Sequence, residues 1–305
     1  MKTRVTALIL STLLVGTLVA ESVQAASNSI VGSPKLEVLV DGQKVRFQGG
    51  DPVSESGRVQ VPLRGVGEAL GAEVSYNEAG KKVTYTKGDK AIVLMIDGKQ
   101  ATVDGRTVTM DTAAKAVKGR TYVPLRFVSE NLGVTVNWDQ AANWVWIGSK
   151  EILTPEEAGV KSVPIGDFKK LIGNQKFILK NALGIEYTTV NVVKVDQLPL
   201  KIGDRVIYDI WPVKQGTVEG LKMRASNGDP ALVYLGTKID ARIRDSLEYL
   251  LEKNPDKTRT LTYPIVLGHD IDFDKNYKNL KLAQIEYIVV VMSSDALTVI
   301  ENPFK

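Results

Sequence analysis

An internal repeat constrains the fold of the first half of this chain more than any other feature. Residues 57–71 align without a gap with residues 119–133, an offset of 62 residues (119 minus 57). Both stretches contain Gly-Arg-x-x-Val-Pro-Leu-Arg and end in Leu-Gly. Self-similarity at a fixed spacing indicates that one supersecondary unit occurs twice. We therefore expect two copies of one small structure in this region.

Each copy predicts a short strand, a two-turn helix and a β-hairpin, in that order. Proline follows the strand, where the first turn of a helix tolerates a missing N–H group. In the first copy Leu63, Val66 and Leu70 share one helix face, and alternating residues over 73–76 and 81–85 predict the hairpin. A helix this short is not stable alone and must pack on a sheet. We expect an α+β fold: a duplicated β-hairpin and short-helix module followed by a second small α+β domain.

The repeated motif, the Asp41-Gly42 turn and Val-Asn-Trp-Asp at 136–139 together resemble the copper amine oxidase N-terminal-like domain, or stalk domain, of exported Gram-positive bacterial proteins. The resemblance covers about residues 36–148. It implies a non-catalytic accessory domain, because the copper ligands and quinone-forming tyrosine of those enzymes lie in a separate domain. The chain has one histidine, His269, whereas copper(II) of this class needs several imidazoles. A three-histidine copper site within the chain is therefore excluded, and we expect no cofactor.

Residues 1–25 predict a secretory signal peptide. Lys2 and Arg4 precede an apolar run over 5–20, and Val23-Gln24-Ala25 offers a cleavage site before Ala26. The alternative is a membrane anchor, but the run is short for a transmembrane span. The chain has no cysteine, which excludes disulfides and thiolate metal sites. We expect a secreted or extracellular protein without a transmembrane anchor, either free or associated with the cell wall.

The two copies differ on one face of their hairpins. Lys82 and Thr84 of the first copy are replaced by Trp144 and Trp146 in the second. Two indoles at i and i+2 on one strand form a flat aromatic surface, which Tyr122 extends, and such surfaces bind sugars or anchor interfaces. Three alternatives remain: the second domain covers the pair, a glycan or peptide binds there, or two copies of the chain associate through it.

Two further features of the repeat have structural explanations. Trp138 corresponds to Tyr76 of the first copy, and we expect the Trp138 side chain in the core. Arg64 and Arg126 of the Val-Pro-Leu-Arg motifs occur once in each copy, so we expect them to brace a strand end or a carboxylate. Each also lies four residues before a glutamate, a spacing that stabilises a helix slightly.

The second half shows no repeat and resembles no family that we recognise. We expect a separate α+β domain over residues 160–305. The clearest predicted helix covers 238–253, because Ile239, Ile243 and Leu247 recur on one face. A shorter helix is expected over 166–172, and strands over 176–179, 188–195, 205–211 and 285–292.

Candidate chemistry in the second half is sparse. Asp270, Asp272 and Asp274 alternate and are a weak calcium candidate, since an EF-hand loop needs glycine and glutamate where this chain has lysine. The alternative is a solvated acidic turn. His269 beside Asp270 offers an acid–base pair, but no Gly-x-Ser-x-Gly nucleophile motif accompanies it. We identify no catalytic residue and no metal site beyond that candidate.

Two functions follow from these patterns. The first is a non-catalytic binding or scaffold protein of the cell surface, whose partner is a cell-wall polymer or an extracellular protein. Nucleic acid is not expected, since a net charge of +4 without a clustered basic face is too weak. The alternative is a secreted hydrolase with its active site in residues 151–305. A deep cleft holding His269 among converging carboxylates would favour the hydrolase.

Overall fold

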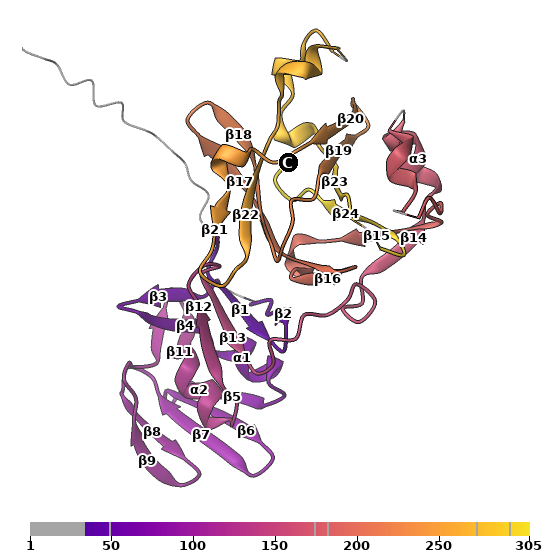
Figure 1. Ribbon diagram of the computed structural model, residues 1–305. Coiled ribbons are helices and arrows are strands. Elements are labelled where there is room, and N and C mark those ends of the chain that lie inside the picture. Colours follow the sequence, from indigo (N-terminus) through magenta and orange to yellow (C-terminus); the bar gives the residue numbers. More distant parts are fainter. Residues whose placement is uncertain (1–33, 49, 174, 182, 273, 293) are drawn as a thin grey trace, which may run out of the picture.

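The computed structural model describes residues 34–305 except 49, 174, 182, 273 and 293 (Figure 1). Within these residues the chain forms five sheets and three α-helices, each of seven residues. Strands account for 44% of the residues, and helices, with the short 3₁₀ helices included, for 16%. The expected α+β class is therefore wrong, and the fold is β-rich. The predicted signal peptide lies outside the described residues, and no helix among those described has the length and apolar character that a membrane crossing needs.

The first half, here called the module, repeats its elements at the spacing found in the sequence. Strands β3 and β4 and helix α1 recur 62 residues later as β10, β11 and α2, and the hairpins β5–β6 and β12–β13 follow them. Strands β7, β8 and β9 separate the two copies. In chain order the elements are β1 (Glu37–Val40), β2 (Gln43–Lys44), β3 (Val53–Glu55), β4 (Arg58–Pro62), α1 (Leu63–Ala69), β5 (Glu73–Asn77), β6 (Lys82–Lys87), β7 (Lys90–Met95), β8 (Gln100–Val103), β9 (Arg106–Thr109), β10 (Lys115–Val117), β11 (Arg120–Pro124), α2 (Leu125–Asn131), β12 (Val136–Asp139) and β13 (Trp144–Ile147).

The two copies pair with each other through equivalent residues. Strands β4 and β11 are antiparallel, and Val61 lies opposite Val123, its counterpart in the repeat. A self-complementary contact of this kind is what a local two-fold relation produces. Both valines are fully buried in the core of the module, together with Val66 of α1 and Val128 of α2. The short helices are thus stabilised by packing against the sheets, as their length requires.

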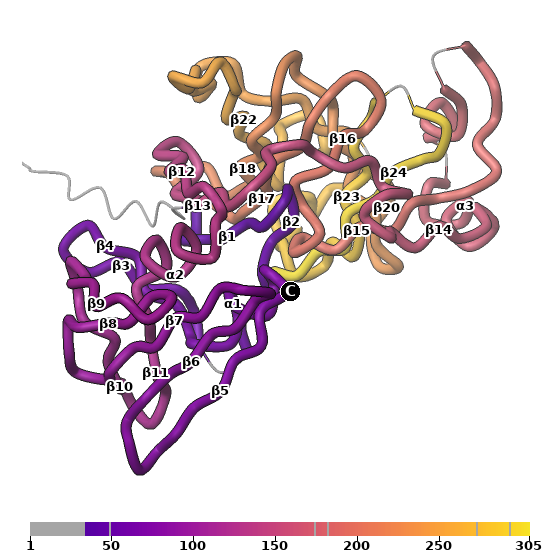
Figure 2. Tube along the Cα trace, turned by 90° about the horizontal axis from the view of Figure 1, so that it is seen from below, coloured from indigo at the N-terminus to yellow at the C-terminus, as the bar shows by residue number. Residues whose placement is uncertain are grey.

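The sheet of order β12-β13-β1-β2 has two differently covered faces. Strand β1 runs parallel to β13, with Val38 beside Val145 and Leu39 beside Trp146. Because side chains alternate along a strand, the valines enter the core of the module, whereas Leu39 and Trp146 face the opposite way. Tyr208 of the second half packs against this second face, and Figures 1 and 2 both show the sheet next to the second half.

The second half packs two sheets face to face. A six-stranded sheet has the order β14-β15-β24-β23-β19-β20, and a five-stranded sheet has the order β16-β17-β18-β22-β21. Leu232 and Tyr234 of β19 face the space between the sheets, whereas Val233 and Leu235 face α3 on the outer side. The elements are β14 (Lys161–Pro164), α3 (Gly166–Ile172), β15 (Thr189–Val193), β16 (Leu200–Ile202), β17 (Arg205–Gln215), β18 (Val218–Ala225), β19 (Leu232–Gly236), β20 (Ile239–Arg244), β21 (Glu252–Lys253), β22 (Arg259–Pro264), β23 (Tyr287–Val290) and β24 (Leu297–Glu301), with short 3₁₀ helices between several of them.

The helix predicted over 238–253 is wrong, and this error accounts for much of the incorrect fold class. The segment contains β20, a 3₁₀ turn and β21. Ile239 and Ile243 are four residues apart, a spacing that shares a face in a strand as well as in a helix. In the structure Ala241 and Ile243 pack in the outer cluster beneath α3, whereas Ile239 packs in the cluster between the sheets. The predicted strand over 176–179 is also wrong, because these residues form the 3₁₀ helix η1 (Lys176–Leu179).

Candidate functional site

Trp144 and Trp146 are buried where the two halves of the chain meet. Their exposed fractions are 0% and 3%. The Trp144 ring lies 5.9 Å from that of Trp146 and 6.4 Å from that of Tyr208 on β17. Leu39 and Ile152 complete this small apolar cluster. Three alternatives were open for the tryptophan pair, and in the structure the second half of the chain covers both side chains. The pair therefore offers no accessible binding surface.

Buried charges cross the same seam. Lys44 of β2 pairs with Asp209 of β17 at 3.0 Å, and Arg224 of β18 pairs with Asp139 of β12 at 3.0 Å. The Arg224 guanidinium lies 4.7 Å from the centre of the Tyr208 ring. Burial raises the pKa of the Asp209 carboxyl, although Lys44 acts in the opposite direction. These ion pairs attach the second half to the module, although the buried Arg224 Nη1 atom has no hydrogen-bond partner among the described residues.

Tyr122 does not extend the tryptophan surface. It lies on β11, in a different sheet from Trp144 and Trp146, and its exposed fraction is 7%. Its hydroxyl lies close to Gly50, where a Cβ atom would overlap the oxygen. The three residues predicted to form one binding surface are therefore separated into two buried places.

The alternating aspartates of the second half do not converge. The Asp270 carboxylate is buried and accepts two hydrogen bonds from the Arg244 guanidinium, at 3.1 and 2.7 Å. Asp272 and Asp274 are exposed, and Asp274 accepts a hydrogen bond from the backbone N–H of Asn276 at 2.8 Å. No group of three or more potential ligands able to hold a metal ion occurs among the described residues.

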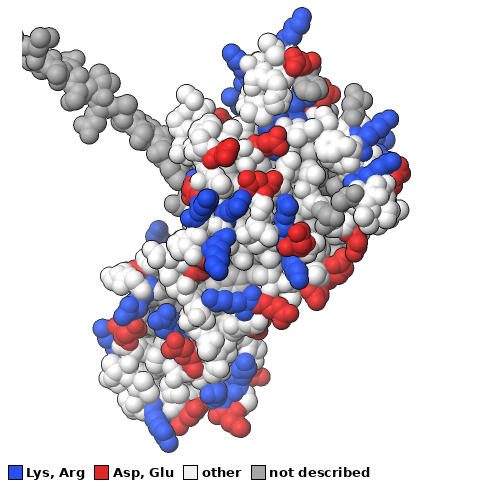
Figure 3. Space-filling view, in the orientation of Figure 1, with Lys and Arg blue, Asp and Glu red and all other residues white. Residues whose placement is uncertain are grey.

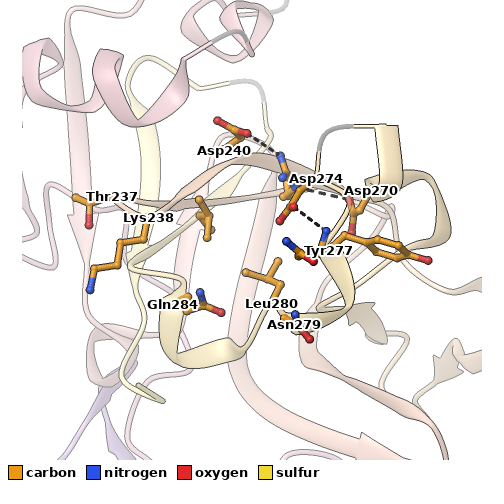
Figure 4. Close-up of a pocket in the computed structure, with 12 residues that line it drawn as sticks. Thr237, Lys238, Asp240, Asp270, Asp274, Tyr277, Asn279, Leu280 and Gln284 are labelled. Carbon is orange, nitrogen blue, oxygen red and sulfur yellow. Dashed lines mark hydrogen bonds and ion pairs between the residues drawn. The ribbon is translucent and has the colours of Figure 1, made fainter.

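His269 lies outside the pocket that the neighbouring aspartates line. This pocket has a volume of about 680 Å³, and its polar lining includes Lys238, Asp240, Asp270 and Asp274 (Figure 4). His269 is exposed on a 3₁₀ turn and is not among the lining residues. Asp270 is engaged by Arg244 rather than turned to a substrate. The arrangement that would favour a hydrolase at His269 is therefore not formed.

Trp138 is the tryptophan of the module that reaches the surface. Its exposed fraction is 45%, so the expectation of a core position is wrong. Strand β12 is the outermost strand of its sheet, and Trp138 has only Val145 of β13 opposite it. Tyr76 stands at the matching place on the outermost strand β5 and is 41% exposed. An aromatic side chain on an edge strand has a neighbour on one side only, which explains both exposures.

Trp138 forms one wall of a groove of about 380 Å³ on the second copy of the repeat. Buried Leu125 and Val145 belong to its lining and make it apolar. Arg58 from β4 and Arg126 from α2 stand at its rim, with guanidinium side chains more than half exposed. A concave apolar surface with a few polar groups at its edge is the usual form of a ligand site.

The groove continues past an ion pair into a second hollow of about 490 Å³. The two hollows share Arg58, Asp111 and Thr112, and the Arg58–Asp111 pair stands between them. Gln60 lines the second hollow with an exposed fraction of 2%. Its amide nitrogen contacts Thr112 Oγ1 at 3.3 Å, while its Oε1 atom has no hydrogen-bond partner among the described residues. A buried acceptor without a partner costs free energy, and this oxygen lies beneath the surface of the hollow rather than open to it.

The two copies build the helix side of this surface differently. Phe127 of α2, which lines the groove, corresponds to Gly65 of α1. The ring of Phe47 packs against Gly65 so closely that a Cβ atom there would overlap it. In the first copy an aromatic ring from outside the repeat thus occupies the space next to the helix. Sequence reasoning missed this groove, and the Gly-to-Phe difference together with Trp138 is the signal that could have found it.

Charge on the module is mixed rather than segregated. Figure 3 shows lysine and arginine interspersed with aspartate and glutamate over this face of the molecule. The rim arginines fit this picture, because Arg58 pairs with Asp111 and Arg126 lies 3.8 Å from Glu130. The electrostatic signal of the groove is therefore local, in two guanidinium groups beside one indole.

Comparison with known families concerns the first half alone. Residues 39–147 match the family model of the copper amine oxidase N-terminal domain. This confirms the resemblance inferred from the repeated motif, and the second half has no family match, as expected. The matched model is that of the N-terminal domain, which is not the catalytic domain of those enzymes, and it fits a non-catalytic, stalk-type domain. No curated protein matches the chain.

Proposed function

We propose that this protein is a secreted, non-catalytic binding protein of the cell surface, and that its module holds an anionic cell-wall glycan in the groove at Trp138. The observation that carries the proposal is the 45% exposed indole of Trp138, which borders a groove lined by the buried apolar side chains of Leu125 and Val145. Apolar surface of this size on an edge strand would otherwise remain in contact with water, at a cost of about 25 cal/mol per Å². A ligand that covers the indole recovers that cost.

The chemistry of the rim favours a sugar chain that carries acidic groups. An indole face packs against the apolar C–H face of a pyranose ring. Arg58 and Arg126 flank the indole. Arg58 pairs with Asp111 and Arg126 lies 3.8 Å from Glu130, but both side chains are more than half exposed, and their remaining N–H groups can donate to a carboxylate or phosphate. Asn137, next to Trp138, adds an amide that donates and accepts. These donors and the indole suit a charged polysaccharide better than an apolar peptide.

The extent of the groove favours a polymer over a single sugar. The hollows of about 380 and 490 Å³ adjoin at Arg58 and Asp111. A linear chain passing that ion pair would place one residue on Trp138 and a later one in the second hollow, beside Gln60. Binding along two adjoining hollows explains why the apolar wall and the buried amide lie on one side of the module.

The seam supports a scaffold role for the module. Trp144, Tyr208, Lys44 and Arg224 fix the second half against the face of the sheet opposite the core. Glycan bound at Trp138 would therefore hold the second half at a defined position on the wall. The expected signal peptide, residues 1–25, supports export of the chain to that location.

Co-sedimentation with purified wall material tests the proposal. The full chain is expected to sediment, and Trp138→Ala is expected to weaken binding about ten-fold or more, because truncating a central aromatic costs about 2 kcal/mol. Tyr76→Ala is the matched control, since Tyr76 has nearly the same exposure on the equivalent strand. The proposal fails if Trp138→Ala binds like the unsubstituted chain, or if Tyr76→Ala loses as much binding.

A further inference from the structure

A lysine of the module and an aspartate of the second half meet at the seam, where water has little access. Lys44 of β2 and Asp209 of β17 are 165 residues apart in the sequence, and Lys44 Nζ lies 3.0 Å from Asp209 Oδ1. The exposed fractions of the two side chains are 5% and 10%. The centre of the fully buried Trp144 ring lies 5.1 Å from Lys44 Nζ. An amine and a carboxyl group are therefore held together in largely apolar surroundings.

Burial makes the charged form of this pair costly. An ammonium and a carboxylate lose their hydration when they leave water, and their mutual attraction repays this loss only in part. Burial raises the pKa of the Asp209 carboxyl, although Lys44 lowers it, so the site favours the protonated acid. When a proton passes from the ammonium to the carboxylate, the lysine becomes a free amine, which is a nucleophile. The neutral form of the pair is thus an amine beside a carboxylic acid.

The surroundings of Asp209 suit attack at its Cγ atom. Reacting atoms need to lie about 3–3.5 Å apart, and Cγ is one covalent bond beyond the oxygen that Lys44 Nζ already contacts. The backbone N–H group of Ile210 donates a hydrogen bond to Asp209 Oδ1 at 3.0 Å. Such a donor polarises the carbonyl and stabilises the negative charge that develops on its oxygen. The other oxygen, Oδ2, is then the one that can leave.

Glu37 of β1 supplies a second carboxyl group on the same face of the sheet. It lies beside Trp144 in the parallel pair of β1 and β13, and it is two residues from Leu39, which lies opposite Lys44. Residues two apart in a strand share a face, so Glu37 faces the seam with Lys44. Burial raises the pKa of the Glu37 carboxyl, Lys44 lowers it and Asp209 raises it, because the three groups interact electrostatically. A carboxyl group in this place can carry a proton between nitrogen and oxygen.

We propose that Lys44 and Asp209 condense to an amide, which joins the two halves of the chain covalently. The Lys44 Nζ atom bonds to Asp209 Cγ, the bond from Cγ to Oδ2 breaks, and this oxygen leaves as water. Glu37 takes the proton that the nitrogen releases and delivers it to the leaving oxygen. An ammonium and a carboxylate contain the same atoms and the same net charge as one amide and one water, so the step needs no oxidant, reductant or further reactant. It also removes two buried charges, which favours the amide.

The amide adds a covalent bond to the contacts that already attach the second half to the module. A chain that has not yet condensed keeps the ion pair and the raised pKa of the Asp209 carboxyl. The proposal does not depend on the groove at Trp138, because Glu37, Lys44 and Asp209 are not among its lining residues.

Mass spectrometry of the folded full chain tests the proposal. The intact mass should lie about 18 Da, one water, below the mass calculated from the sequence and the observed N-terminus. Trypsin cuts after lysine and arginine, and residues 36–46 and 206–214 should then appear as one joined species that is not cut after Lys44. A succinimide at an Asp-Gly pair loses the same mass but joins no peptides, so the digest separates the two reactions.

Two variants and an internal control sharpen the test. Lys44→Arg keeps a cation opposite Asp209, but a guanidinium group stays charged and cannot attack, so this variant should have its calculated mass. Glu37→Gln should slow the formation of the joined species about a hundred-fold, measured as the joined fraction over time after expression. Lys222 and Glu252 also form an ion pair, but the Glu252 side chain is 53% exposed, and no joined species is expected there. The proposal is overturned if the unsubstituted chain has its calculated mass, if Lys44→Arg loses one water as well, or if Glu37→Gln forms the joined species at an unchanged rate.

Discussion

The burial of Trp144 at the seam leads to a direct comparison with Trp138, six residues earlier on the same hairpin. Trp144 is fully buried between the two halves, whereas Trp138 is 45% exposed. The Trp144 ring contacts Trp146 and Tyr208, and the Lys44 ammonium lies 5.1 Å from its centre. Replacing each tryptophan with alanine removes the same atoms from two different surroundings.

The surroundings set the expected magnitudes. Truncation of a buried tryptophan costs about 3–5 kcal/mol, through lost transfer free energy and the cavity left behind. Part of this at Trp144 comes from aromatic contacts worth about 0.5–1.5 kcal/mol each and from a desolvated cation–π contact of up to about 2 kcal/mol. Trp138→Ala removes a half-exposed side chain, so we expect a loss below about 1 kcal/mol.

Urea unfolding followed by circular dichroism measures both variants. Trp144→Ala should lower the free energy of unfolding by about 3–5 kcal/mol and Trp138→Ala by less than about 1 kcal/mol. The pair Trp144→Ala and Tyr208→Ala should show a coupling energy of about 0.5–1.5 kcal/mol, because the rings meet across the seam. Equal losses for the two tryptophans, or additivity of Trp144 and Tyr208, would refute the assigned seam.

Three further outcomes are expected. Burial raises the pKa of the Asp209 carboxyl. At a pH between the ordinary and the raised pKa, the folded chain therefore holds a proton that the unfolded chain has released, and the free energy of unfolding falls as the pH rises. Asp209→Asn should remove this part of the pH dependence, which urea titrations from acid to neutral pH would measure. Asp270→Asn should cost about 3–5 kcal/mol in thermal unfolding, because it leaves the fully buried Arg244 charge uncompensated, whereas exposed Asp272→Asn should stay within about 0.5 kcal/mol. Gly65→Ala should lower the free energy of unfolding by about 1–3 kcal/mol in thermal unfolding, since the new methyl group overlaps the Phe47 ring. Gly57→Ala is the control. A methyl group there meets no atom within 4 Å, so this variant should show only the backbone strain of a residue with φ of +73°.

Local order in the module was predictable from the sequence because each copy repeats its own signals. Proline before the helix, glycine after it and alternation in the hairpin all agree, and the predicted elements occur at the same offset in the structure. In the second half α3 forms over 166–172, as expected. The segment 238–253 was not predictable by spacing alone, since isoleucines four residues apart fit either secondary structure.

Sheet order and surface exposure escaped prediction for another reason. Strand β1 lies beside β13, far away in the sequence, and no local pattern encodes that neighbour. The same long-range arrangement decides that Trp144 is covered by β17 while Trp138 stands on an edge strand. The sequence predicted a binding surface at Trp144 and a core position for Trp138, whereas the folded arrangement buries Trp144 at the seam and exposes Trp138 at the groove.

The indole N–H signals in a proton–nitrogen NMR spectrum test the central claim most directly. The chain has four tryptophans, Trp138, Trp144, Trp146 and Trp211, and Trp138→Phe assigns the signal of the groove. Titration with soluble fragments of an anionic wall glycan should shift the Trp138 signal in a saturable way and leave the signals of the seam tryptophans in place. An unchanged Trp138 signal at saturating glycan, or a shift confined to another indole, would contradict glycan binding in the groove.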